Sequence, residues 1–255
     1  MRQLTKLLLL ATLALCAHAV PALAQPRPAV AANPQPRARA MINGGYQPST
    51  TGFDDSFTFT LYQETGTTEI SYDVGAGAIF EGGAAVRVWK GLALGGVISH
   101  FSVDAPGTVT SSVPHPFFLE RYRQVSGEPE GMHREETAIH FQVQYQLPPF
   151  GRLHVVLAGG PSLIDVKQTV VIDVNYAEEF PYDTATFTGV DSKRGTGTAT
   201  GFNAGVDLQW MFNPKLGVGA LVRITKATVD LNIDNRIIQV DAGGTQIAAG
   251  IRLAF

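Results

Sequence analysis

The last residues of the chain alternate between apolar side chains and small or polar ones. Because successive side chains of a β-strand point to opposite faces, this period of two predicts a strand with one apolar and one smaller, more polar face. The apolar set is Ile247, Ala249, Ile251, Leu253 and Phe255, and the other set is Gln246, Ala248, Gly250, Arg252 and Ala254. A chain that ends this way needs an apolar environment for one face of its final strand.

The start of the chain has the composition of an export signal. Arg2 and Lys6 precede an apolar run at 7–17, and small residues follow before Gln25. We therefore expect a secretory signal peptide at residues 1–24. The apolar run has about a dozen residues, fewer than the ~20 that a membrane-spanning helix needs.

Composition narrows the possibilities for the rest of the chain. Cys16, the single cysteine, lies inside the predicted signal, and Leu15 stands where a small residue would precede a lipidated cysteine, so we expect neither a disulfide nor a lipid anchor. No apolar stretch after the signal approaches helix-spanning length. In a membrane such a chain must use strands, since only helices and closed barrels satisfy every backbone group in hydrocarbon. The net charge of −3 gives no reason to expect nucleic-acid binding.

Period-two patterning recurs along the chain after a linker. Residues 25–37 are rich in Pro and Ala, which indicates an extended periplasmic linker before a domain at 38–255. The patterned segments, which we expect to be strands, are 38–47, 75–89, 91–102, 136–147, 152–164, 198–212, 215–226 and 240–255.

The connections between these segments alternate strictly between short and long. The short ones carry turn residues, and the alternation is typical of outer-membrane β-barrels, which have short periplasmic turns and long external loops. Both termini then fall on the periplasmic side. The short connections are 89–91, 148–151 and 213–215, and the long ones are 48–74, 103–135, 165–197 and 227–239.

One segment can be compared with the thickness of a membrane. From Phe202 to Phe212 every second residue is apolar, and ten steps of ~3.3 Å, tilted by ~40°, rise about 25 Å, which is the height of the apolar band of a membrane barrel. Trp89, Tyr145 and Phe255 lie where an aromatic girdle is expected. A soluble β-sandwich or lipocalin-like barrel is the alternative, but its outward face would be polar.

Taken together, these features resemble the eight-stranded outer-membrane β-barrel proteins, the superfamily of the OmpA transmembrane domain and the OmpX and OmpW types. The resemblance implies an all-β, eight-stranded antiparallel transmembrane up-and-down barrel in the cell outer membrane, in contact with lipid and lipopolysaccharide and monomeric. The terminal sequence IRLAF, ending at Phe255, resembles the signal read by the barrel-assembly machinery, which is implied as a folding partner. The peptidoglycan-binding domain of full-length OmpA is not expected.

Charged residues on the face opposite the apolar one are candidates for the lumen. Arginine forms bidentate contacts with carboxylates, so we expect a network of ion pairs across the barrel interior, near glycines that leave room for guanidinium groups. Such a network would either gate solutes or plug the lumen, and we favour the plug because eight strands leave room only for side chains. The network residues are Glu81, Arg87, Asp207, Arg223 and Arg252, and Gln142, Gln144, Gln146, His140 and His154 would extend the polar filling.

One short motif suggests chemistry. His100 and Ser102 share a face of the third segment, and such a His-x-Ser pair resembles the active-site strand of outer-membrane lipid A deacylases. A serine hydrolase also needs a carboxylate to orient the histidine. Asp104, the nearest acid on that face, falls in a predicted loop. We therefore predict no catalytic residue, no metal ligand and no cofactor, with a lipid A-modifying enzyme kept as an alternative.

The first long connection has its own pattern. Alternating apolar residues flank Glu64-Thr65-Gly66-Thr67, which predicts a hairpin at 53–74 with its turn at 64–67. An aromatic hairpin outside the membrane would offer a contact surface. The predicted function is therefore a non-enzymatic outer-membrane barrel for envelope structure or surface interaction through external loops, with a narrow channel for small or hydrophobic solutes as the alternative.

Overall fold

The computed structural model describes residues 36–48, 52–233 and 236–255. The predicted signal peptide, and the predicted linker up to residue 35, lie outside these residues. Within the described ranges, no helix is long and apolar enough to cross a membrane. The strands are β1 (Ala38–Gln47), β2 (Phe53–Leu61), β3 (Glu64–Tyr72), β4 (Gly77–Trp89), β5 (Leu92–Asp104), β6 (Gly107–Pro114), β7 (Tyr122–Gly127), β8 (His133–Gln146), β9 (Leu153–Glu178), β10 (Ala185–Met211), β11 (Leu216–Ile233) and β12 (Arg236–Ala254).

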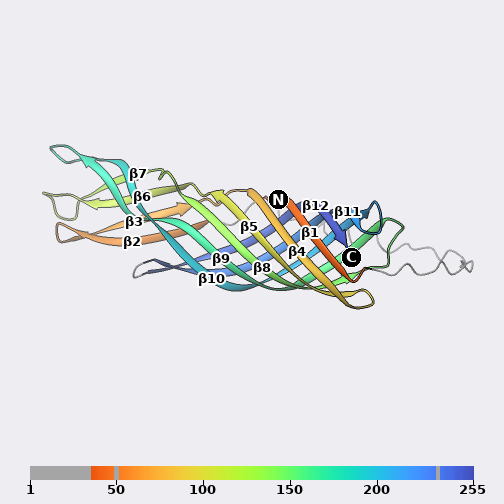
Figure 1. The fold of residues 1–255 in the computed structure, drawn as a ribbon. Coiled ribbons are helices and arrows are strands. Elements are labelled where there is room, and N and C mark those ends of the chain that lie inside the picture. Colours follow the sequence, from red (N-terminus) through yellow and green to blue (C-terminus); the bar gives the residue numbers. More distant parts are fainter. Residues whose placement is uncertain (1–35, 49–51, 234–235) are drawn as a thin grey trace, which may run out of the picture. The chain divides into compact units, whose positions relative to one another are not determined.

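Eight of these strands close into an antiparallel barrel in the order β1-β12-β11-β10-β9-β8-β5-β4 (Figure 1). Strand β1 seals the ring, because it pairs with β4 on one side and with β12 on the other. Asn43, for example, lies opposite Glu81 in β4 and opposite Gly250 in β12. Each barrel strand overlaps one predicted segment, and the predicted fold class is confirmed.

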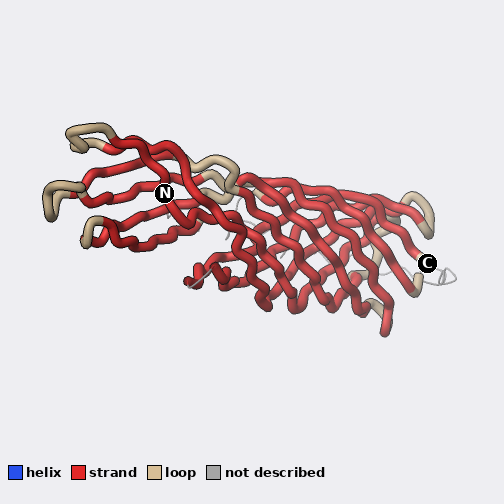
Figure 2. Tube along the Cα trace, turned by 60° about the vertical axis from the view of Figure 1, so that its left-hand side comes forward, coloured by secondary structure: helices blue, strands red, loops and turns tan. Residues whose placement is uncertain are grey.

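The remaining strands form a second antiparallel sheet, in the order β2-β3-β6-β7, and their labels lie at the left of Figure 1. Figure 2 shows strands that extend beyond one end of the barrel. The hairpin predicted at 53–74 is present as β2 and β3, but its turn lies at Tyr62 and Gln63, with φ values of 53° and 66°, and not at Glu64–Thr67. A two-residue turn with positive φ at both positions matches the twist of a hairpin. Gly66 instead lies within β3, where a Cβ atom would overlap the ring of Phe59.

Strand structure extends much further than the sequence pattern predicted. The supposed loop at 165–197 is mostly β9 and β10, which pair as far as Glu178 and Ala185. The supposed loop at 103–135 contains β6 and β7. The supposed loop at 227–239 contains the last residues of β11 and the first residues of β12. Polar residues such as Lys167 on the outer face resemble loop composition, whereas Val166 and Val170 keep the inner face apolar and buried.

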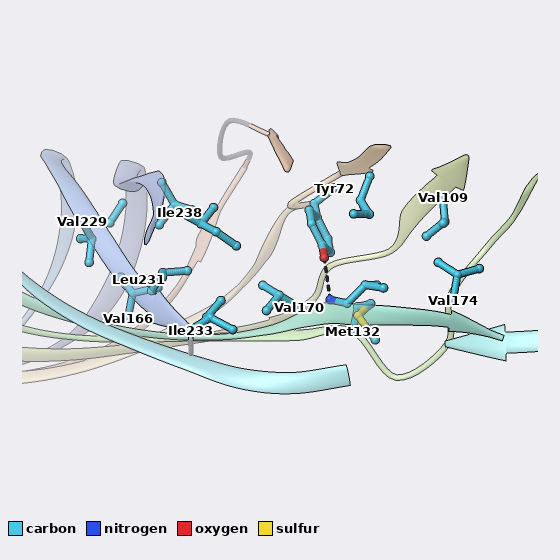
Figure 3. Close-up of a cluster of buried hydrophobic side chains, with 14 of the residues drawn as sticks. Tyr72, Val109, Met132, Val166, Val170, Val174, Val229, Leu231, Ile233 and Ile238 are labelled. Carbon is cyan, nitrogen blue, oxygen red and sulfur yellow. Dashed lines mark hydrogen bonds between the residues drawn. The ribbon is translucent and has the colours of Figure 1, made fainter. Parts of the chain in front are cut away.

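One apolar core joins the second sheet to the end of the barrel that lies away from the short turns (Figure 3). Val166, Leu231 and Ile238 from barrel strands and Tyr72 from β3 belong to the same buried cluster. The backbone N–H of Val171 donates a hydrogen bond to the Tyr72 hydroxyl oxygen at 2.8 Å. Burial raises the pKa of Tyr72 to about 12, so this hydroxyl stays neutral at physiological pH.

Candidate functional site

The outer face of the barrel carries an apolar band. On β10, Phe202 is 55% exposed, Trp210 48% and Phe212 52%. Trp89 and Phe255 are also exposed, at the end of the barrel where the short turns lie. Such a continuous exposed apolar surface is typical of a lipid-facing barrel and excludes a soluble one, whose outward face is polar.

A buried ion pair crosses the middle of the lumen. The Arg223 Nη2 atom lies 2.5 Å from Glu81 Oε2, and both side chains are almost completely buried. The Nε and Nη2 atoms of Arg223 also donate hydrogen bonds to Gln246 Oε1, at 2.8 and 2.6 Å. The Arg223 guanidinium group is therefore held by Glu81 on one side and by Gln246 on the other. Gln246 in turn donates a hydrogen bond to Gln47 Oε1 at 3.0 Å.

A second buried ion pair lies nearer the end of the barrel that carries the chain terminus. Arg252 donates from Nε to Asp207 Oδ2 at 2.9 Å and from Nη2 to Asp207 Oδ1 at 2.8 Å, which is a bidentate contact. Arg252 Nη1 also donates to Asn43 Oδ1. Because Asn43 Nδ2 donates to Glu81 Oε1 at 2.6 Å, Asn43 links the two ion pairs.

Of the predicted network residues, Glu81 pairs with Arg223, Asp207 pairs with Arg252, and Asn43 links the two pairs. Arg87 is half-buried in β4, six positions beyond Glu81. The sequence analysis did not assign Asn43 and Gln246 to the network. Their inward register positions opposite Gly250 and Arg223 would have identified them, but uncharged amides give a weaker sequence signal than charges do.

Further polar side chains fill the lumen around these pairs. His140 is completely buried and lies 2.9 Å from Ser99 Oγ and 2.8 Å from Ser162 Oγ. Gln142 donates to Asn203 Oδ1 at 3.0 Å. These hydrogen bonds connect the predicted polar filling across neighbouring strands. Among the residues that the structure describes, no three His, Cys, Asp or Glu side chains are grouped as a metal ion would require.

A further buried ion pair, which the sequence analysis missed, lies between these polar side chains and the external end of the barrel. Arg134 donates from Nε to Glu136 Oε1 at 2.8 Å, and the other carboxylate oxygen accepts a hydrogen bond from the backbone of Gly243 at 2.9 Å. Both residues belong to β8 and face inward. The pattern was missed at Arg134 because the segment was predicted to begin only at 136.

At the external rim of the barrel, polar side chains replace the outward apolar ones. Ser102 Oγ lies 3.1 Å from His133 Nε2, and His133 Nδ1 lies 3.1 Å from Asp104 Oδ1. The histidine singled out from the sequence, His100, lies on the same face but contacts Thr137 Oγ1 through Nδ1 at 3.2 Å. His100 and Ser102 therefore have different partners, and the histidine that contacts Ser102 is His133.

A second exposed cluster lies where three connections of the external part meet. The rings of Phe117 and Tyr182 contact edge to face, with centroids 5.6 Å apart, and Phe180 packs on Tyr182 at 6.1 Å. The backbone N–H of Glu120 donates to Glu64 Oε1 at 2.6 Å, which joins the β6–β7 connection to the start of β3. We call this cluster the aromatic tip, made of Phe117, Phe118, Leu119, Phe180 and Tyr182.

Comparisons with known proteins identify folds only. No family model matches the chain, and no curated protein matches it. Among solved structures, the crystal structure of Neisserial surface protein A matches at 11% identity with a TM-score of 0.47, covering 86% of this chain and 97% of that one. The outer-membrane protease OmpT from Escherichia coli matches at 9% identity, TM-score 0.47, with the same coverage, 86% and 97%. Ail, the attachment invasion locus protein of Yersinia pestis, matches at 11% identity, TM-score 0.36, covering 85% and 99%.

The closed ring of eight antiparallel strands and its apolar outer band define the class of protein. The chain is an integral outer-membrane β-barrel protein, and its architecture is that of the small eight-stranded barrels expected from the sequence.

Proposed function

We propose that the protein is an envelope barrel whose role is surface interaction through the aromatic tip. Phe117, Leu119 and Phe180 are 67%, 78% and 82% exposed, and this observation carries the proposal. Large apolar side chains gathered on an external surface mark an interaction site. In this role the barrel acts as a membrane anchor for the aromatic tip. Outer-membrane lipid and lipopolysaccharide surround it, and the barrel-assembly machinery inserts it as a monomer.

The charges around the aromatic tip favour a neutral apolar partner. Arg123 pairs with Glu178 at 2.5 Å, and Arg121 pairs with Asp183 at 2.8 Å. The guanidinium group of Arg121 also lies over the Phe118 ring, 5.4 Å from its centroid. Exposed Glu120 and Glu179 remain, and they would be repelled by an anionic surface. The partner that fits is a neutral lipid surface into which the apolar side chains insert.

Binding to vesicles tests this role. Protein in nanodiscs is expected to float with phosphatidylcholine vesicles and less with phosphatidylglycerol vesicles. The triple variant Phe117→Ser, Phe118→Ser, Phe180→Ser is expected to lose more than about tenfold in affinity, because burying one phenyl side chain contributes ~1.5–3 kcal/mol. Thr58→Ala, Thr60→Ala, Gln124→Ala on exposed strand positions is the control. Equal flotation of wild type and the Phe variant would contradict the proposal.

The alternative role as a narrow channel is opposed by the packing of the lumen. Two linked ion pairs fill its middle, and apolar residues such as Ile164 and Leu231 close it toward the external side. We therefore expect the wild-type protein to show no unitary conductance in planar bilayers. Arg252→Ala is expected to stay silent as well, since the apolar layer is unchanged. Stable single-channel steps from the wild type would support transport instead.

A further inference from the structure

The arrangement at the external rim goes beyond a surface-interaction role. Ser102 and Asp104 come from β5 and His133 from β8, and the imidazole ring bridges the other two side chains at 3.1 Å on each side. We propose that Ser102, His133 and Asp104 form a serine-hydrolase triad on the outer face of the barrel. Its substrate class is a carboxylic ester that joins an apolar acyl chain to a polar headgroup.

The strand register explains why the three side chains meet. Asp104 lies directly opposite His133 in the β5–β8 ladder, and Ser102 lies two residues earlier on the same face of β5. A carboxylate at Nδ1 selects the tautomer in which Nδ1–H donates to Asp104. Nε2 is then free of a proton and accepts the hydrogen bond of the Ser102 hydroxyl. This is the order of roles, acid to base to nucleophile, that serine hydrolases use.

The structure supplies the acid that the sequence analysis did not find. Asp104 was placed in a loop, but it is the last residue of β5, so its position relative to Ser102 is fixed by the strand. His133 is 31 residues from Ser102 in the chain and begins a different strand. A motif search along one strand selects His100 instead, because a cross-strand partner is visible only when the pairing of β5 with β8 is known.

The place of the triad in the fold indicates its substrate. On the membrane side of the triad, Phe80 lies opposite His100 in the β4–β5 ladder. Phe80 and Ile98 are 66% and 57% exposed and lie at the external edge of the apolar band. Ser102 is four residues beyond Ile98, about 10 Å higher at ~3.3 Å per residue and a ~40° tilt. An acyl chain lying against the band would therefore bring its ester group to the height of the Ser102 hydroxyl.

The reaction needs only water in addition to the ester. Ser102 Oγ bonds to the carbonyl carbon while His133 Nε2 takes the hydroxyl proton. The bond between the carbonyl carbon and the ester oxygen breaks, and the alcohol leaves with the proton held by His133. Water then attacks the acyl-serine, gives a proton to His133, and releases the carboxylic acid as Ser102 recovers its proton.

The charges that face His133 come from four strands. Asp104 on β5 contacts Nδ1, and Glu135 on β8 has an oxygen 3.7 Å from Nε2. Arg194 on β10 holds the other Glu135 oxygen at 2.7 Å, and Lys167 on β9 lies opposite Glu135. Hydrogen bonding to Arg194 lowers the pKa of Glu135, which keeps this carboxylate ionised and occupied by the arginine.

The test uses the full chain in detergent micelles with a fluorophosphonate probe and a medium-chain p-nitrophenyl ester. We expect the probe to attach to Ser102, identified by peptide mass spectrometry. Ser102→Ala and His133→Gln are expected to reduce hydrolysis about 10²–10⁴-fold. Asp104→Asn is expected to reduce the rate and change its pH profile. His100→Gln, on the same face but outside the triad, is the matched control and is expected to keep the wild-type rate.

Migration of each variant with and without boiling shows whether its barrel is folded, so a loss of activity is separated from a loss of structure. The proposal is overturned if folded wild-type protein gives no adduct at Ser102, or if folded Ser102→Ala hydrolyses the ester as fast as wild type. If the probe labelled Ser102 but the His133→Gln variant hydrolysed the ester at the wild-type rate, the assignment of His133 as the base would also be overturned. These outcomes are independent of vesicle binding by the aromatic tip.

Discussion

Replacing Arg223 by methionine is expected to lower the free energy of unfolding by about 3–5 kcal/mol, because it leaves the buried Glu81 carboxylate without its counter-charge. Both side chains of this pair are almost completely buried, with the ion-pair atoms 2.5 Å apart. Gln246 also loses its donors. Urea unfolding in lipid vesicles, followed by the fluorescence of Trp89 and Trp210, measures the change.

Two further variants separate an unpaired charge from a lost contact. The double variant Glu81→Gln, Arg223→Met is expected to recover most of the stability, since replacing a buried pair as a whole is close to neutral. Arg194→Met breaks the 2.7 Å pair with Glu135, in which Arg194 is 50% exposed, and is expected to cost at most about 1 kcal/mol. If Arg223→Met were as mild as Arg194→Met, the buried network would not stabilise the barrel.

Gly250→Val is expected to prevent closure of the barrel. Gly250 lies in β12 opposite Asn43 of β1, at the seam between the first and last strands. A Cβ atom there would overlap the backbone carbonyl oxygen of Ile42 and lie 2.6 Å from Asn43 Oδ1. Overpacking typically costs about 1–3 kcal/mol, and here the clash is with backbone, which cannot move without opening the seam. The heat-modifiable band on a gel is expected to disappear.

Gly96→Val is the matched control for this seam variant. Gly96 also lies within a barrel strand, β5, but a Cβ atom at this position meets nothing within 4 Å. Its side chain would point outward into the apolar band, so the variant is expected to fold as the wild type does. Normal folding of both variants would show that close backbone approach at the seam is not needed.

The barrel could be predicted from the sequence because the two faces of each strand meet different environments. Lipid on one side and a filled lumen on the other impose a strict period of two, as in the run from Phe202 to Phe212. Above the membrane this contrast weakens, because outward positions such as Lys167 become polar while Val166 stays buried. The ends of β9, β10 and β11 were therefore interpreted as loops.

The polar residues of the lumen and rim were harder to predict than the strands. Charge identified Glu81, Arg223, Asp207 and Arg252 as inward residues, since an ionised side chain cannot face lipid at low cost. Which residue contacts which depends on barrel closure, so the link through Asn43 was not visible. The same limit applies at the rim, where the partner of Ser102 is on a strand that follows it by a long connection.

Strands β9 and β10 each run without a break from a short turn of the barrel to the aromatic tip, over 26 and 27 residues. A pull on the connection between them acts along both strands in the same direction. The pull then shears β9 against β8 and β10 against β11. Because antiparallel hydrogen bonds are perpendicular to the strands, many of these hydrogen bonds must break at the same time. A pull on the aromatic tip is therefore expected to meet more resistance than it would if these hydrogen bonds opened one at a time.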